Sequence, residues 1–196
     1  MEYLIIFCIG LILAIIGSLQ PGPVNSYVFL YSKKSNIDAA NRVAMGGSLV
    51  QGIVASLALA LIIKFDFKLA IPNIFAAMFL IALGLFFFGK SKTLDTLDHN
   101  ESKKYFLQGI GFAIANPQVI MYWTLVSTIV CQSINIFGSY STFYFGIGAY
   151  LGTFIALTIY KKLGTNNMFN QIDNRLIYNS LGLFFIIAGF IKLLSI

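Results

Sequence analysis

Charged side chains are scarce in this chain: 10% of its 196 residues are Asp, Glu, Lys or Arg, and 58% are hydrophobic. A soluble domain carries about 25% charged residues, so this composition predicts an integral membrane protein rather than one with a water-facing surface. We expect one transmembrane domain over 1–196, because no polar stretch exceeds the one around 90–104. The net charge of +6 is then expected to come from basic cytoplasmic loops, and nucleic acid is not an expected partner.

Cysteine is nearly absent, and the apolar runs contain no acidic residue. Cys8 and Cys131 fall in apolar runs and are expected to be small buried hydrophobes. An ionisable group at membrane depth marks a proton relay or a cation site. Its absence argues against a simple proton-carrier mechanism and a dicationic substrate, and no motif predicts a metal or a cofactor. The acidic residues, all at termini or in predicted loops, are Glu2, Asp38, Asp66, Asp95, Asp98, Glu101 and Asp173.

Apolar runs of about 20 residues are long enough for a helix to cross roughly 30 Å of hydrocarbon. We predict an all-α protein with six spans, at 3–31, 43–63, 69–89, 105–130, 136–160 and 176–194. Loops one, three and five hold ten lysines and arginines, against three on the other side. Since lysine and arginine mark cytoplasmic loops, both termini are predicted to face outward.

Proline is rare, but it breaks two of the apolar runs: Gln20-Pro21-Gly22-Pro23 interrupts the first, and Asn116-Pro117 the fourth. Proline breaks a helix because it lacks an N–H and clashes with the preceding turn. Lipid tolerates such a break only where the backbone is buried in protein or lines a wet cavity. The breaks therefore predict the two walls of one substrate site. If the first break forms a re-entrant hairpin instead, the N-terminus moves to the cytoplasmic side.

The two breaks occupy the first helix of each group of three spans, which suggests an inverted repeat. An odd number of spans per half gives the halves opposite orientations, and discontinuous helices then form a site at the repeat interface. We expect halves at 1–89 and 105–196, joined by a charged cytoplasmic loop at 90–104, with Gln20-Pro21 corresponding to Asn116-Pro117. Glycines in the second and fifth spans would let helices pack closely, or would mark a homodimer face.

A helix that restarts after a break has unpaired N–H groups and a partial positive end, which can hold a carboxylate. Carbonyls ending the preceding half-helix, with the side-chain oxygens of Gln20 and Asn116, are predicted to accept an ammonium group. Together they form a site for a zwitterion. The residues predicted to bind the substrate are Gln20, Pro21, Gly22, Pro23, Asn25, Ser26, Ser48, Gln51, Asn116, Pro117 and Tyr122.

Each of these polar side chains also has a purely structural interpretation. Gln20, Asn25 and Asn116 can cap the broken helix ends through hydrogen bonds. Gln51 can join two helices without touching a substrate. Tyr122 and Trp123 can fill the core or face lipid.

Several of these motifs resemble the lysine exporter (LysE/RhtB-type) translocators. Pro21-Gly22-Pro23, with Asn25 and a basic loop after it, is similar to the first motif of that family, and Phe106-x-x-Gly109 before Asn116-Pro117 is similar to a later one. The resemblance implies a six-span secondary transporter, not an enzyme, that exports amino acids or similar metabolites across the bacterial cytoplasmic (inner) membrane. It implies that the membrane potential or a proton gradient drives transport. Family members often carry an acidic residue where this chain has Gln51.

Two other functions stay open from the sequence. A divalent-metal exporter needs thiolate, imidazole or carboxylate ligands, and the spans offer only Cys8 and Cys131. A membrane thiol carrier would use the same two cysteines beside helix-breaking prolines. They lie 13 and 14 residues from Pro21 and Pro117 respectively. The substrate, the coupling ion and the oligomeric state are not specified by any motif.

Overall fold

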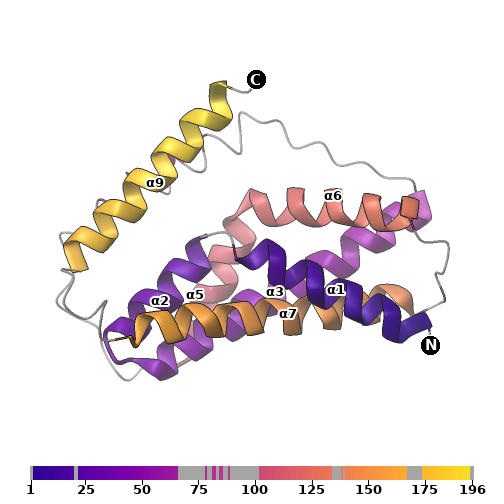
Figure 1. The fold of residues 1–196 in the computed structure, drawn as a ribbon, viewed down its shortest axis with the longest axis horizontal. Coiled ribbons are helices and arrows are strands. Elements are labelled where there is room, and N and C mark those ends of the chain that lie inside the picture. Colours follow the sequence, from indigo (N-terminus) through magenta and orange to yellow (C-terminus); the bar gives the residue numbers. More distant parts are fainter. Residues whose placement is uncertain are drawn as a thin grey trace.

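A computed structural model shows an elongated bundle of helices (Figure 1). It describes residues 2–19, 22–65, 78, 81–82, 84–85, 88, 102–133, 138, 140–166 and 174–194. Within these residues all regular secondary structure is helical, which confirms the predicted all-α class for this part of the chain. The helices are α1 (Glu2–Ser18), α2 (Pro23–Lys33), α3 (Ile37–Phe65), α5 (Ser102–Ala115), α6 (Pro117–Ser133), α7 (Ser141–Gly164) and α9 (Asn174–Leu194).

The described residues contain up to four candidate membrane spans. Helices α3 and α7 are each long and apolar enough to cross a membrane. The pairs α1–α2 and α5–α6 pass the same test together, with bends of 71° and 63° at the two predicted breaks. The predicted third span, 69–89, lies mostly outside the described residues. The predicted sixth span corresponds to α9, which contains the shorter apolar stretch Gly182–Ile191.

Helix α3 begins at Ile37, earlier than hydropathy predicts, because local hydrogen bonds shape the turn before it. The N–H groups of Ser35 and Asn36 donate to the carbonyls of Ser32 and Tyr31, which closes the end of α2 with Ser35 at φ 59°. Asn36 Oδ1 then accepts the N–H of Ala39 at 3.0 Å and caps α3. Hydropathy alone does not detect such a polar cap.

The broken pair α1–α2 runs parallel to α7 from one end of the bundle to the other. Near the N-terminus the Tyr3 ring stacks on the Tyr144 ring at 5.1 Å. Further along, Gly10 lies against the Phe145 carbonyl and Gly148 against the Phe7 carbonyl, so closely that a Cβ on either glycine would overlap the oxygen. At the far end, Gly164 of α7 packs against α2. The glycines thus allow the helix backbones to approach closely.

The broken pair α5–α6 runs parallel to α3 and makes a matching crossing. Gly109 lies against the Val43 carbonyl, and Gly46 lies against the Phe106 carbonyl. The two crossings have the same geometry. Each glycine contacts a backbone carbonyl of the partner helix, and that carbonyl belongs to the residue three positions before the partner helix's own glycine. Helices α3 and α7 run antiparallel to one another, since Lys161 Nζ donates to Asn41 Oδ1 at 2.8 Å.

Among the described residues, the basic ends of α2, α5 and α7 meet at one end of this bundle. Gly164, just after Lys161 and Lys162, packs against Ser32, and Tyr105 contacts Tyr31 edge-on at 5.2 Å. These contacts bring the end of α2, the start of α5 and the end of α7 together. The N-terminus lies at the opposite end (Figure 1).

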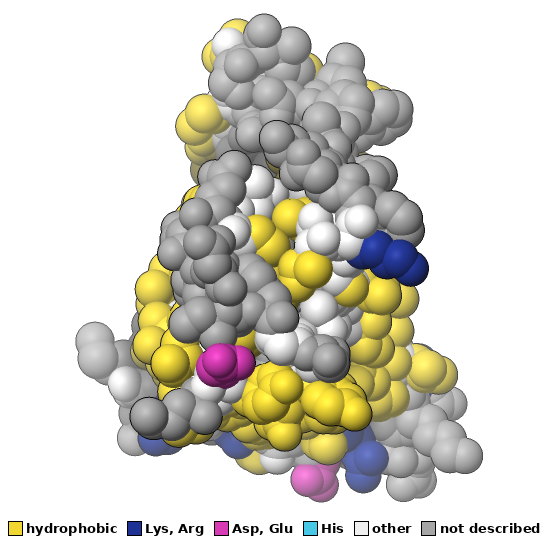
Figure 2. Space-filling view, turned by 90° about the vertical axis from the view of Figure 1, so that its right-hand side faces the viewer, with side chains coloured by type: hydrophobic (Ala, Val, Ile, Leu, Met, Phe, Trp, Pro, Cys, Tyr) yellow, Lys and Arg dark blue, Asp and Glu magenta, His cyan; other side chains and the backbone are white. Residues whose placement is uncertain are grey.

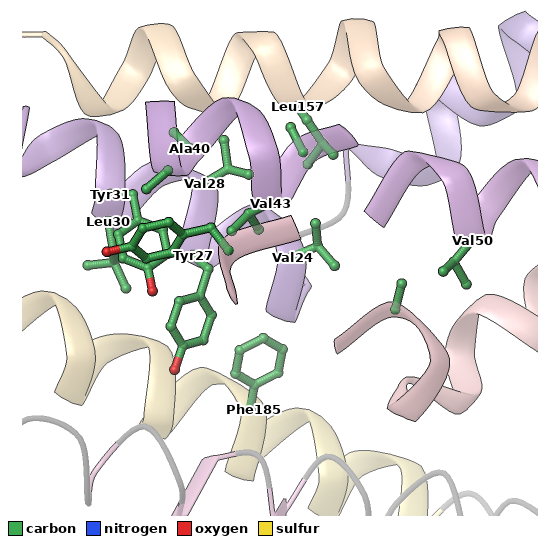
Figure 3. Packing of buried hydrophobic residues seen from close by; sticks show 14 residues of the cluster. Val24, Tyr27, Val28, Leu30, Tyr31, Ala40, Val43, Val50, Leu157 and Phe185 are labelled. Atoms are coloured by element: carbon green, nitrogen blue, oxygen red, sulfur yellow. The ribbon is translucent and has the colours of Figure 1, made fainter. Parts of the chain in front are cut away.

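The outer surface is rich in exposed leucine, isoleucine and phenylalanine, as a lipid-facing surface requires. Hydrophobic side chains also dominate the described surface at the N-terminal end (Figure 2). Inside, a buried cluster joins α2, α3, α5 and α7. It includes Phe185 of α9, which lies near Tyr27 of α2 (Figure 3).

Candidate functional site

The two helix breaks lie next to each other near the middle of the bundle. Gly22 and Pro23 begin α2, and Asn116 and Pro117 begin α6. A Cβ built on Gly22 would be 3.9 Å from both Asn116 Nδ2 and Asn25 Oδ1, which is ordinary contact. Residues almost a hundred positions apart in sequence are therefore neighbours at the breaks.

A pocket opens between the breaks. The pocket has a volume of about 70 Å³, which is enough for several waters or for the polar head of a small solute. Its walls come from the end of α1, the start of α2, the middle of α3 and the first two turns of α6. The lining residues are Gly17, Ser18, Gly22, Asn25, Gln51, Asn116, Gln118, Val119, Tyr122 and Trp123.

Five of the predicted site residues line this pocket: Gly22, Asn25, Gln51, Asn116 and Tyr122. Four others are described but do not line it: Pro23, Ser26, Ser48 and Pro117. Ser26 and Ser48 are buried, and their hydroxyls have no hydrogen-bond partner among the described residues. Gln20 and Pro21 lie outside the described residues.

The last carbonyls of α1 are hydrogen-bonded by side chains from other helices. Asn25 Nδ2 donates to the Ser18 carbonyl at 2.6 Å, and the Tyr160 hydroxyl donates to the Leu19 carbonyl at 2.6 Å. The Ser18 hydroxyl donates to Thr153 Oγ1 at 3.3 Å. At the first break the carbonyls of Ser18 and Leu19 therefore each accept a side-chain hydrogen bond, and Asn25 acts as a helix-end cap.

Asn116 caps the first turn of α6. Its Oδ1 accepts the N–H of Gln118 at 3.1 Å, and its carbonyl accepts the N–H of Val119 at 3.1 Å. Because a backbone N–H only donates, the oxygen of this carboxamide must face the helix. The Nδ2 group is left on the Gly22 side, with no partner among the described residues. In this arrangement Asn116 offers the pocket a hydrogen-bond donor, the reverse of the predicted acceptor.

The orientation of the Gln51 side chain is fixed in a similar way. The indole Nε1–H of Trp123 donates to Gln51 Oε1 and joins α6 to α3. An indole nitrogen is a donor only, so the Gln51 oxygen must face it. The Nε2 group has no partner among the described residues. Gln51 therefore joins two helices and also lines the pocket with its NH2 group available.

Tyr122 closes one wall of the pocket against α1. Its hydroxyl donates to the Leu13 carbonyl, and its ring lies over Gly17, where any Cβ would overlap the ring. The phenol oxygen keeps lone pairs that can accept a hydrogen bond from a solute. Tyr122 thus brings a hydrogen-bond acceptor to the same pocket lining as the amide donors.

Sequence reasoning missed Gly17 and Ser18 as lining residues. They precede the first break by three or four residues, and this position was the available signal. Hydropathy placed them inside an apolar run, whereas the bend exposes the end of α1 to the pocket. No side chain caps the first turn of α2, whose N-cap is Gly22, so the positive end of α2 faces the same space.

The length and hydropathy of these helices define a multi-pass helical membrane protein. Its uncharged polar pocket lies between the two broken helix pairs, α1–α2 and α5–α6. A family model described as LysE type translocator matches residues 15–195. The chain therefore belongs to the LysE type translocator family, which confirms the resemblance seen in its motifs and makes it a membrane transporter rather than an enzyme. No curated protein and no solved structure was found to match.

Proposed function

We propose that this protein is a secondary transporter that exports amino acids or related small zwitterions across the bacterial inner membrane. The substrate binds in the pocket between the helix breaks. Its carboxylate is held by the NH2 groups of Asn116 and Gln51 and by the first turn of α2. Its ammonium group is held by the phenol oxygen of Tyr122.

The observation that carries this proposal is the complementary polarity of the pocket lining. Asn116 and Gln51 offer donors because their oxygens are already hydrogen-bonded. Tyr122 offers an oxygen, because its hydroxyl proton is donated to the Leu13 carbonyl. A solute with one anionic and one cationic end suits this set of uncharged groups, and hydrogen bonds to charged groups are the stronger ones.

The proposed topology has six spans, with both termini outside and the charged loop 90–104 in the cytoplasm. It is supported by the described basic residues Lys33, Lys104 and Lys161, which lie at one end of the bundle, and by the N-terminus at the other end. It is also supported by the parallel course of α1–α2 along α7, which a broken span explains and a re-entrant hairpin does not.

We also propose the inverted 3+3 repeat, with halves 1–89 and 105–196. The support is the matching pair of glycine crossings, in which Gly10 and Gly148 have the same mutual contacts as Gly109 and Gly46. The helix starts suggest that Gly22-Pro23, rather than Gln20-Pro21, corresponds to Asn116-Pro117. In both helices proline is the first residue, where its missing N–H does not weaken the helix.

The test replaces Asn116 by Asp in protein reconstituted into liposomes, and measures counterflow uptake of radiolabelled amino acids. Asp keeps the oxygen that caps α6 but loses the NH2 donor and adds a negative charge. We expect uptake to fall about tenfold to a hundredfold, since a hydrogen bond to a charged group contributes roughly 1.5–3 kcal/mol.

The matched control is Asn36→Asp. Asn36 caps α3 in the same manner at the basic end of the bundle and does not line the pocket. This variant is expected to transport at the wild-type rate. Equal rates for Asn116→Asp and the wild type, with both proteins folded, would show that the pocket does not hold the substrate.

A further inference from the structure

We infer that the pocket selects amino acids with a small uncharged side chain over basic ones, and that Trp123 is a positioning residue that sets this preference through Gln51. The inference rests on the proposed function and adds the substrate class to it. It starts from the hydrogen bond between Trp123 Nε1 and Gln51 Oε1, which joins α6 to α3 inside the pocket wall.

Without the indole, a glutamine side chain can present either its oxygen or its NH2 group to a neighbour. The indole N–H removes this freedom, because it accepts nothing and must face the oxygen. Gln51 is then held as a donor toward any solute. Trp123 itself is 1% exposed, and its ring packs edge-on against Phe145 at 5.5 Å, so the indole has little room to move.

The other groups expected to bind an anion also present hydrogen-bond donors or partial positive charge to the pocket. Asn116 is 7% exposed and offers Nδ2 on the Gly22 side. The uncapped first turn of α2 adds a partial positive charge. Three donors in the lining of one pocket suit a carboxylate. Because every amino acid has a carboxylate, this group by itself cannot distinguish among them.

Discrimination comes from the substrate side chain. Every described residue that lines the pocket is uncharged, so a lysine or arginine side chain would lose water without gaining an opposite charge, which is strongly unfavourable. The small pocket volume also favours a short side chain. Alanine, serine and threonine meet both conditions.

The experiment measures counterflow in liposomes containing the full-length protein, with radiolabelled alanine, serine, threonine and lysine. For the wild type we expect kcat/KM for the best neutral amino acid to exceed that for lysine at least tenfold. Trp123→Phe keeps an aromatic ring but removes the N–H, and it should raise KM several-fold with little change in kcat.

A double-mutant comparison distinguishes positioning from simple packing. In protein that already carries Gln51→Ala, Trp123→Phe should have no further effect on KM, since the residue it positions is gone. Additive effects on KM would overturn the positioning role. Both proteins in this comparison carry Gln51→Ala and differ only at residue 123. A general loss of stability from either change therefore does not decide whether Trp123 is a positioning residue.

Gln51→Glu provides an independent test of polarity. Glu keeps an oxygen for the Trp123 N–H but replaces the NH2 donor with a negative charge, so uptake of neutral amino acids should fall at least tenfold. The matched control is Gln108→Glu. Gln108 Oε1 accepts the Tyr31 hydroxyl at 2.8 Å on α5, and Gln108 does not line the pocket. This control should transport like the wild type.

The outcomes separate this inference from the function on which it rests. If none of the amino acids is transported, the proposed function fails. If lysine is transported as well as or better than the neutral amino acids, the function stands and the inference about substrate class is overturned. If Gln51→Glu transports neutral amino acids at the wild-type rate, the role of Gln51 as a donor is overturned.

Discussion

Asn25 and Tyr160 both donate to carbonyls at the end of α1, but in different surroundings. The Ser18 carbonyl, bonded by Asn25, belongs to a residue that is 8% exposed, whereas Leu19, bonded by Tyr160, is 50% exposed. At membrane depth neither carbonyl can count on water to replace a lost partner, so either one costs about 1–3 kcal/mol when it is left unpaired. We expect Asn25→Ala and Tyr160→Phe each to destabilise the protein by about that amount.

The measurement is thermal unfolding of each purified variant in detergent. Thr158→Ala serves as a further control, because the Thr158 hydroxyl bonds only to the Phe154 carbonyl within its own helix. A loss for Tyr160→Phe no larger than that for Thr158→Ala would contradict this expectation and mean that the Leu19 carbonyl finds another partner.

The polarity of the individual amides shows where sequence reasoning reaches its limit. The residue types at the breaks predicted correctly that amide groups gather there, because proline motifs and amides are visible in the sequence. Which end of Asn116 faces the pocket depends on the bond its oxygen makes to the Gln118 N–H. For Gln51 it depends on Trp123, on another helix. Such choices follow from tertiary contacts and have no sequence signal of their own.

Helix α5 provides a sharp test of close packing, because it carries two glycines in different environments. A Cβ on Gly109 would overlap the Val43 carbonyl, and this backbone atom can move only if α3 moves. A Cβ on Gly111 meets nothing within 4 Å. Gly109→Ala should therefore destabilise the protein by about 1–3 kcal/mol. Gly111→Ala should be neutral or stabilise it by up to about 1 kcal/mol, since alanine favours the helix.

Thermal unfolding in detergent measures both variants, and the transport assay then shows whether the crossing also affects activity. Gly46→Ala should resemble Gly109→Ala, because the two glycines pack against each other's helix. A Gly109→Ala protein as stable as the Gly111→Ala protein would mean that α3 and α5 do not cross at this point.

Among whole helices, the sequence predicted the positions of both breaks but not their details. Proline chemistry placed a break near 21–23 and another at 117. It did not specify that α2 begins at Pro23 with Gly22 as its N-cap, because Pro21 and Pro23 each satisfy the rule for a helix start. Hydropathy likewise missed the first turns of α3, where Asn36 rather than an apolar residue sets the boundary.

For the whole bundle, the contacts of the N-terminus make the topology testable. Tyr3 packs on Tyr140 and Tyr144, so Glu2 and Tyr140 lie at the same end, while Asn166 follows the last turn of α7 at the basic end.

In a chain with Cys8 and Cys131 replaced by Ser, single cysteines are placed at Glu2, Tyr140 and Asn166. A membrane-impermeant maleimide applied to intact cells should label Glu2→Cys and Tyr140→Cys. It should label Asn166→Cys only after permeabilisation, because basic loops are retained in the cytoplasm. A re-entrant hairpin at the first break would place Glu2 with Asn166 instead, and the Glu2→Cys protein would then react only in permeabilised cells.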